Sequence, residues 1–252
     1  MSAGPAARTG EDVVVRVAGP LRFLLPLRDR AAGERRLRFD AAATVGHLVQ
    51  AAGVPLSEIG PPALNGAPVP LAARARPGGV IDVVPAPRPQ PVPPGGFLLD
   101  VGLGALARRM RLLGLDAAWS RTADDPDLVA RAAAEERVLL TQDRGLLMRR
   151  ALPAGALVRG SGPDGQLADV LDRFAPELAP LTRCTACGGE LRPVPKAEVA
   201  HLLEPGTRRS YDEFSRCSRC GRVYWRGAHA RRIDALVTAF GGAPHVPASR
   251  SP

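Results

Sequence analysis

Aromatic side chains are scarce in this 252-residue sequence, where they make up only 4% of the residues. So small a supply argues against a base-stacking platform built from several aromatic rings, as in an RNA-recognition-motif sheet. No stretch approaches the roughly 18 consecutive apolar residues that a membrane-spanning helix needs. Residues 1–12 also lack the apolar segment of a signal peptide. We therefore expect a cytoplasmic protein with no membrane partner.

Lysine is nearly absent, since one lysine accompanies 33 arginines in a chain of net charge +9. Residues 97–180 carry 12 acidic and 11 basic residues, whereas the segments before and after carry net charges of +4 and +6. Basic flanks suit a polyanion such as RNA, and an acidic segment between them suits a divalent cation. A coding preference for arginine would explain the same excess without a partner.

Residues 12–85 have the pattern of a small domain with two strands, a helix and two further strands. The pattern predicts strands at residues 13–17, 35–39 and 80–84 and a helix at residues 44–53. Asn65-Gly66 signals a hairpin. This order resembles the β-grasp fold of ubiquitin-like sulfur carriers, which act through a free C-terminal Gly-Gly. Here Gly95-Gly96 is followed by 156 residues, so we expect a docking domain with a protein partner.

A proline-rich segment at residues 86–96 separates this domain from the rest of the chain. Six of the ten residues from Pro85 to Pro94 are proline, which predicts an extended, semi-rigid linker. Strand and helix patterns then alternate over residues 97–180, which predicts an α/β domain with a parallel sheet. Residues 181–235 hold all four cysteines and form the last predicted domain.

Aspartates follow two apolar strands of the predicted parallel sheet. Asp100 comes directly after residues 97–99, and Asp143 comes just after residues 138–141. Strand ends of a parallel sheet meet at one edge, so we expect these two carboxylates to share Mg²⁺ or Mn²⁺ with Asp125. Such an ion activates water and stabilises a phosphoryl transition state. Helix capping by Asp125 and solvation of Asp100 and Asp143 in loops are the alternatives.

The cysteines form the most specific motif in the chain. They are arranged as two CxxC pairs, Cys184 with Cys187 and Cys217 with Cys220. Two such pairs supply four thiolate ligands for a tetrahedral structural zinc, with no position left for catalysis. Each pair is followed by glycine, as expected for a knuckle that needs an unusual backbone conformation. Disulfides are the alternative, which a cytosolic location argues against.

Several motifs resemble the Mut-seven C-terminal RNase family, a branch of the PIN-like nucleases. Residues 97–116 are similar to its opening motif, which includes Asp100 and the run Arg-Leu-Leu-Gly-Leu-Asp at residues 111–116. Residues 137–147 are similar to its second motif, although Gln142 stands where the family usually has arginine. The paired CxxC motifs and the run Tyr-Trp-x-Gly-x-His at residues 224–229 match as well. A fused ubiquitin-like domain is one known arrangement of the family.

The resemblance implies a PIN-like α/β fold, metal-dependent RNA cleavage and a zinc ribbon. The expected catalytic carboxylates are Asp100, Asp125 and Asp143, and PIN-like sites often use a fourth, here Asp116 or Asp124. Arginines near the predicted edge are candidate phosphate contacts, namely Arg108, Arg111 and Arg144. His229 is expected to be structural or to face phosphate. The alternative is a non-catalytic RNA-binding or adaptor protein that uses the zinc ribbon and the β-grasp domain.

Overall fold

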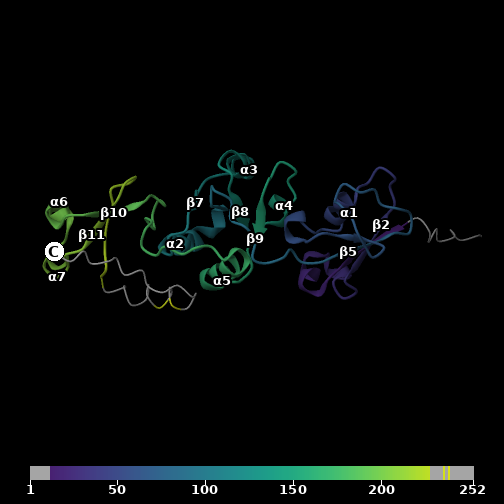
Figure 1. Cartoon of the computed structure of the whole chain (residues 1–252), viewed down its shortest axis with the longest axis horizontal. Helices are drawn as coiled ribbons and strands as arrows, with labels where there is room; N and C mark the ends of the chain where they lie inside the picture. The colour runs from purple at the N-terminus through teal and green to yellow at the C-terminus, as the bar shows by residue number, and fades with distance from the viewer. Residues whose placement is uncertain (1–11, 228–234, 236–237, 239–252) are drawn as a thin grey trace, which may run out of the picture. The chain divides into compact units, whose positions relative to one another are not determined.

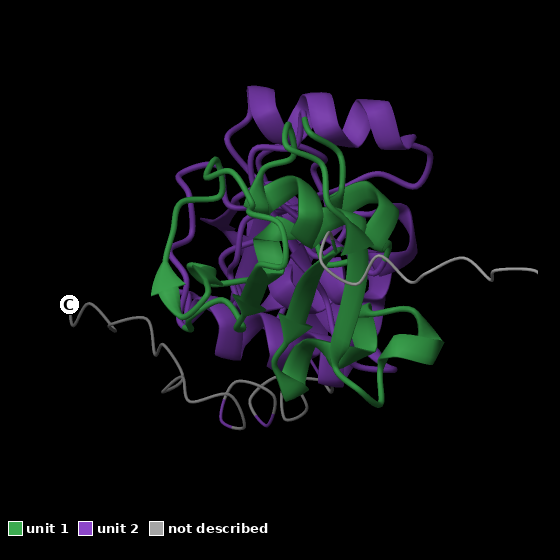
Figure 2. Cartoon of the chain, turned by 90° about the vertical axis from the view of Figure 1, so that its right-hand side faces the viewer, with its two compact units in different colours: residues 1–88, 143–150 green, residues 89–142, 151–252 purple. Residues whose placement is uncertain are grey.

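The contacts within the chain divide it into two compact units, which Figure 2 colours separately. The computed structural model describes residues 12–227 together with residues 235 and 238. Unit 1 comprises residues 1–88 and 143–150, and unit 2 comprises residues 89–142 and 151–252. The predicted α/β domain is thus divided, because residues 143–150 group with unit 1, while most of it shares unit 2 with the cysteine segment.

A five-stranded sheet with the strand order β2-β1-β5-β3-β4 forms the centre of unit 1. The strands are β1 (Asp12–Val17), β2 (Glu34–Arg38), β3 (Ala63–Leu64), β4 (Ala67–Pro68) and β5 (Val80–Val83). β1 pairs antiparallel with β2 and parallel with β5. The turn between β3 and β4 has positive φ at both Asn65 and Gly66, so the predicted hairpin is confirmed.

Helix α1 (Val45–Ala51) contributes the main helical part of the unit 1 core. Its Val45, Leu48 and Val49 are buried, and Thr44 caps its start by accepting a hydrogen bond from the His47 amide at 3.2 Å. The short helices of this unit are η1 (Gly19–Leu24), η2 (Leu27–Asp29), η3 (Leu56–Glu58) and α4 (Arg144–Leu147). The order of strands and helix predicted for the first domain is confirmed.

Unit 2 contains a four-stranded parallel sheet with the order β7-β6-β8-β9, of which Figure 1 labels β7, β8 and β9. The strands are β6 (Phe97–Leu99), β7 (Ala117–Trp119), β8 (Val138–Thr141) and β9 (Gly155–Leu157). The helices that accompany them are η4 (Val101–Leu103), α2 (Gly104–Leu112), α3 (Asp125–Ala134) and α5 (Pro163–Phe174). The predicted parallel α/β sheet is therefore confirmed.

The central strands β6 and β8 are buried on both faces of this sheet. Phe97 and Leu99 of β6 belong to the same hydrophobic core as residues of α2 and α5. Leu98 and Leu139 are also fully buried but do not belong to that core. Side chains alternate along a strand, so these two lie on the other face of the sheet. Strands covered on both faces have continuous apolar runs, which is why β6 and β8 could be recognised in the sequence.

The cysteine segment of unit 2 contains a three-stranded antiparallel sheet with the order β10-β11-β12. The strands are β10 (Leu191–Val194), β11 (Phe214–Cys217) and β12 (Val223–Trp225). Three short helices lie between β10 and β11, namely α6 (Lys196–Val199), η5 (Ala200–Leu202) and α7 (Pro205–Ser210). This insertion accounts for the long gap between the two CxxC pairs.

The proline-rich segment makes hydrogen bonds at its start and in its middle. The Ala86 amide donates to the Glu58 carbonyl at 2.9 Å within unit 1. Within unit 2, the Gln90 amide donates to the Arg173 carbonyl at 2.7 Å, and the Gln90 side chain accepts from Arg173 Nε at 2.7 Å.

Among the residues that the structure describes, no helix is long and apolar enough to cross a membrane.

Candidate functional site

Asp100 is held in place at the carboxyl end of β6. Its Oδ2 accepts a hydrogen bond from Thr141 Oγ1 at 2.6 Å, and its Oδ1 accepts from the Val101 amide at 2.6 Å. Its own amide donates to the Leu140 carbonyl at 3.0 Å. Thr141 is fully buried at the end of β8, so the hydroxyl that orients Asp100 comes from the neighbouring strand. Thr141 is not among the functional residues predicted from the sequence.

Asp143 follows the end of β8 by two residues. β6 and β8 are parallel neighbours, with Leu99 paired to Leu140, so both strands lead toward the same edge of the sheet. Asp143 caps α4 by accepting from the Gly145 amide at 2.6 Å, and its side chain is exposed. The preceding Gln142 donates from Nε2 to the Val158 carbonyl at 3.3 Å, so its amide is engaged with the segment that follows β9.

The start of α3 differs by one residue from the sequence prediction. Asp124, not Asp125, is the capping residue, because its Oδ1 accepts from the Asp127 amide at 2.9 Å. Asp125 lies in the first helical turn and is half-buried. The capping bond occupies one carboxylate oxygen of Asp124. Asp125 is therefore not the helix cap, which was the alternative explanation for this residue.

Asp116 lies at the opposite end of the strands from Asp100. It precedes β7, and the register pairs Ala117 with Phe97, the first residue of β6. Its carboxylate contacts two arginines there, Arg137 at 2.8 Å and Arg183 at 3.1 Å. This position at the amino ends of the strands removes Asp116 from the candidates for a fourth carboxylate beside Asp100.

The three candidate arginines have different surroundings. Arg111 has only 2% of its surface exposed, and its Nε donates to the Ala117 carbonyl at 2.8 Å. Arg144 is exposed, and its Nη1 donates to the Leu24 carbonyl at 2.6 Å within unit 1. Arg108 is exposed on α2. Burial removes Arg111 from the expected phosphate contacts, because a phosphate would have to replace its carbonyl partners in the interior.

The four cysteines form a compact cluster of free thiols. All four sulfur atoms lie within 4.8 Å of one another, with Cys187 Sγ 3.5 Å from Cys217 Sγ and Cys184 Sγ 3.7 Å from Cys220 Sγ. Tetrahedral thiolate ligands about 2.3 Å from zinc lie about 3.8 Å apart. Gly188 and Gly221 have φ values of +77° and +72°, the left-handed conformation expected of the knuckles. The cluster fits a zinc ion.

Hydrogen bonds and burial act in opposite directions on the thiols. Burial alone would raise the pKa of Cys184, but hydrogen bonds from the Tyr224 hydroxyl and the Cys187 and Ala186 amides lower this pKa to about 6. Burial raises the pKa of Cys187 to about 12, and hydrogen bonding with the neighbouring thiols adds to the rise. The surroundings therefore lower the pKa of one thiol of the cluster and raise that of another.

Arg111 connects the parallel-sheet core to the first cysteine knuckle. Its Nη1 donates to the Ala186 carbonyl at 2.9 Å and the Thr185 carbonyl at 3.3 Å, both between Cys184 and Cys187. Burial lowers the pKa of the Arg111 guanidinium, and the charges of Cys187 and Cys184 oppose that effect. A buried cation beside thiolates offsets their negative charge, which sequence reasoning had not assigned to this residue.

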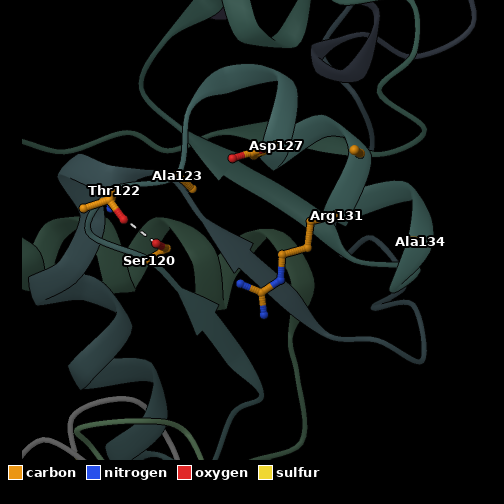
Figure 3. A pocket seen from close by; sticks show the side chains of 7 residues that line it. Ser120, Thr122, Ala123, Asp127, Arg131 and Ala134 are labelled. Carbon is orange, nitrogen blue, oxygen red and sulfur yellow. Dashed lines mark hydrogen bonds between the residues drawn. The ribbon is translucent and has the colours of Figure 1, made fainter.

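A hollow of about 520 Å³ opens at the carboxyl end of β7, beside α3. Figure 3 shows Ser120 and Thr122 on one side of it and Arg131 of α3 on the other. The Thr122 amide donates to Ser120 Oγ at 3.3 Å, and Arg131 Nε donates to Glu135 Oε1 at 2.7 Å. None of the predicted catalytic aspartates lines this hollow.

Within the described part of the chain, the cysteine cluster is the one group of three or more cysteine, histidine or acidic side chains close enough to share a metal ion. Asp100 and Asp125, which both belong to unit 2, are not members of such a group among the described residues. His229 lies outside the described residues.

Comparison with protein families agrees with this architecture. A model of the Mut7-C RNAse domain matches residues 95–237, and a model of the Mut7-C ubiquitin domain matches residues 10–91. No curated protein and no solved structure matches the chain. The first match covers more than half of the 252 residues and includes the parallel sheet and all four cysteines. The chain therefore belongs to the Mut7-C RNAse family and has an N-terminal ubiquitin-like domain.

Proposed function

We propose that this protein is a metal-dependent ribonuclease that cleaves RNA phosphodiester bonds. One observation carries the proposal: Asp100 is fixed by Thr141 at the end of β6, beside the strand that leads to Asp143. Oriented carboxylates at the carboxyl edge of a parallel sheet are where α/β enzymes place their chemistry. Membership of the Mut7-C RNAse family supports RNA as the substrate class.

The proposed cation site is built on Asp100 at the end of β6, with Mg²⁺ or Mn²⁺ as the ion. Asp143 is the second carboxylate that the sequence predicts for it. Mg²⁺ is commonly held by one or two carboxylates together with waters and substrate phosphates, so a closed three-carboxylate cage is not required. Once bound, a divalent cation lowers the pKa of a coordinated water and stabilises the negative charge that develops on the phosphate. Thr141 keeps Asp100 oriented, which limits the reorganisation needed when RNA arrives.

Asp125 and Arg108 are the proposed supporting groups. Asp125 lies in the first turn of α3, after the strand that flanks β6 on its other side, and Asp124 already supplies the helix cap. Asp125 is the third carboxylate that the sequence predicts for the site. Arg108 is exposed on α2 and is a candidate phosphate contact.

We further propose that one zinc ion is bound by Cys184, Cys187, Cys217 and Cys220. The support is the spacing of the four sulfur atoms, which matches a tetrahedral site. Zinc in such a site supplies folding free energy to the small domain around it. A reducing compartment such as the cytoplasm would keep the thiols available for the metal.

The competing function is that of an RNA-binding adaptor without catalysis, in which the ubiquitin-like domain recruits a protein partner. It predicts RNA binding but no cleavage under any metal condition. The ordered pairing of Thr141 with Asp100 favours the nuclease, because an adaptor for a polyanion gains nothing from an oriented carboxylate.

A cleavage assay on mixed-sequence RNA tests the proposal. The protein is purified with its zinc and assayed without added metal, with Mg²⁺ and with Mn²⁺. A strong chelator is avoided, because it would also remove zinc. Wild type should cleave only with Mg²⁺ or Mn²⁺, and Asp100→Asn should not cleave. The matched control is Asp116→Asn, the same change at the opposite end of the strands. Equal cleavage by wild type and Asp100→Asn would refute the proposed site.

A further inference from the structure

The two faces of the β10-β11-β12 sheet have different surroundings. Cys217 and Tyr224 lie on one face, and the Tyr224 hydroxyl is 3.0 Å from Cys184 Sγ, so this face is turned toward the cysteine cluster. Side chains alternate along a strand, so the residues between them lie on the opposite face. That opposite face, which we call the ribbon face, carries Arg192, Val194, Phe214, Arg216, Val223 and Trp225.

Two arginines are placed directly opposite each other on the ribbon face. The register pairs Arg192 of β10 with Arg216 of β11, and both residues are exposed. Like charges at directly opposed positions destabilise a sheet. Arg192 contacts Glu190 at 3.0 Å, but both side chains are more than 60% exposed, and such pairs contribute little and exchange readily. Arg216 Nε donates to the Gly221 carbonyl at 3.3 Å, a neutral partner that leaves the charge of Arg216 in place. An anion held between the two guanidinium groups would relieve their repulsion.

A tryptophan is exposed near these arginines. Trp225 has 43% of its surface exposed, although the described part of the chain has few exposed aromatic rings. The ring is supported by Phe214, whose centroid lies 6.4 Å away and which is itself buried. Trp225 is paired with Phe214, two residues along β11 from Arg216, which is about 7 Å along the strand. One nucleotide can span that distance.

We propose that the ribbon face binds single-stranded RNA, with a phosphate between Arg192 and Arg216 and an unpaired base stacked on Trp225. Arginine forks match phosphate oxygens, and aromatic rings stack bases of any sequence. A duplex hides its base faces, so the tryptophan favours single strands. One exposed ring provides a single stacking position, in keeping with a sequence too poor in aromatics for a larger platform. The inference deepens the proposed function by identifying how the same substrate is held.

Binding can be measured separately from cleavage. Fluorescence anisotropy with a labelled single-stranded RNA of mixed sequence is recorded on the Asp100→Asn protein, with zinc content checked for every variant. Trp225→Leu keeps an apolar cover over Phe214 and should weaken binding about tenfold, the loss expected for one stacked base. Trp225→Tyr should restore most of the affinity. A duplex of the same sequence should bind more weakly and be insensitive to Trp225→Leu.

The arginines are tested by their effect on salt dependence. Arg192→Gln with Arg216→Gln should reduce the slope of log Kd against log salt by about 0.7, the contribution of the one phosphate of a single strand that the two arginines hold. The matched control is Arg28→Gln with Arg36→Gln, two exposed arginines of unit 1 that have acidic neighbours of their own. The control should leave the slope within error of the parent protein.

The outcomes separate this inference from the proposed function. Unchanged RNA affinity in both ribbon-face variants overturns the inference, even if wild type cleaves RNA. The inference is also overturned if these variants bind RNA normally but no longer bind an acidic peptide that wild type binds. The ribbon face would then bind a protein partner instead. Loss of RNA binding in these variants supports it, even if wild type shows no cleavage and the proposed function fails.

Discussion

The buried hydroxyl of Thr141 donates a hydrogen bond to Asp100 Oδ2 across 2.6 Å, from one parallel strand to the next. The second oxygen of Asp100 is held by the Val101 amide. A carboxylate fixed at both oxygens has little freedom to turn away from the edge of the sheet. This pairing is the geometric basis of the proposed nuclease site.

Replacing Thr141 with valine removes this donor while keeping the shape of the side chain. A hydrogen bond to a charged group contributes about 1.5–3 kcal/mol, so Thr141→Val should slow metal-dependent cleavage by about 10- to 100-fold. Thr141→Ser, which keeps the hydroxyl, should retain most of the activity. The concentration of Mg²⁺ needed for half-maximal cleavage should rise in the valine variant. Equal rates and metal requirements in both variants would remove Thr141 from the site.

Arg111 should be needed for zinc retention rather than for RNA contact. Arg111→Met leaves the carbonyls of Ala117, Thr185 and Ala186 without their donor. The Ala117 carbonyl is buried, and a buried group left unpaired costs about 1–3 kcal/mol. We expect a lower free energy of unfolding and faster loss of zinc to a chromogenic chelator. Arg108→Met, the same change on the exposed side of the same helix, is the control. Slow zinc release from both variants would contradict this role.

Zinc retention should depend on pH through the cysteine thiols. Protons compete with zinc for thiolates. The pKa of Cys184 is lowered to about 6, so this thiol opposes zinc little at neutral pH, and acid that protonates it adds to the competition. Retention should therefore weaken as the pH falls. Cys187, with a pKa raised to about 12, should release its proton only on zinc binding. Calorimetry in buffers of different ionisation enthalpy measures that proton, and retention unchanged from pH 8 to pH 5 would contradict the account.

Loss of one cysteine should unfold the ribbon locally. Cys217→Ser removes a buried ligand at the end of β11, and zinc sites of this kind supply on the order of 10 kcal/mol in small domains. Hydrogen exchange should then rise across β10, β11 and β12, while β6 and β8 stay protected by their own core. If zinc-free Cys217→Ser shows unchanged hydrogen exchange across β10, β11 and β12, the metal does not stabilise this sheet.

The sequence predicted those elements whose local pattern is unambiguous. β6 and β8 are continuous apolar runs because both of their faces are buried, and α2 has apolar side chains at helical spacing. β7 was not predicted, because Ala117, Ala118 and Trp119 include no β-branched residue. β9 and α5 were not predicted either, and the grouping of residues 143–150 with unit 1 depends on tertiary contacts.

The site was predictable in its residue types more than in its geometry. The double CxxC spacing specified the cysteine cluster, and the strand ends located Asp100 and Asp143. The sequence offered Asp116 and Asp124 equally as a fourth carboxylate. In the structure Asp116 pairs with two arginines, and Asp124 accepts a hydrogen bond from a helix amide. The burial of Arg111 depends on where the cysteine knuckle packs, which no local pattern records.

Single-turnover cleavage by Asp143→Asn is the measurement that tests the central claim most directly. The change keeps the size of the side chain and removes the charge that would hold the cation. With zinc content and thermal stability equal to wild type, the account predicts loss of Mg²⁺-dependent RNA cleavage in Asp143→Asn and retained cleavage in Asp116→Asn. Cleavage by Asp143→Asn at the wild-type rate would contradict a cation site built on Asp100 and Asp143.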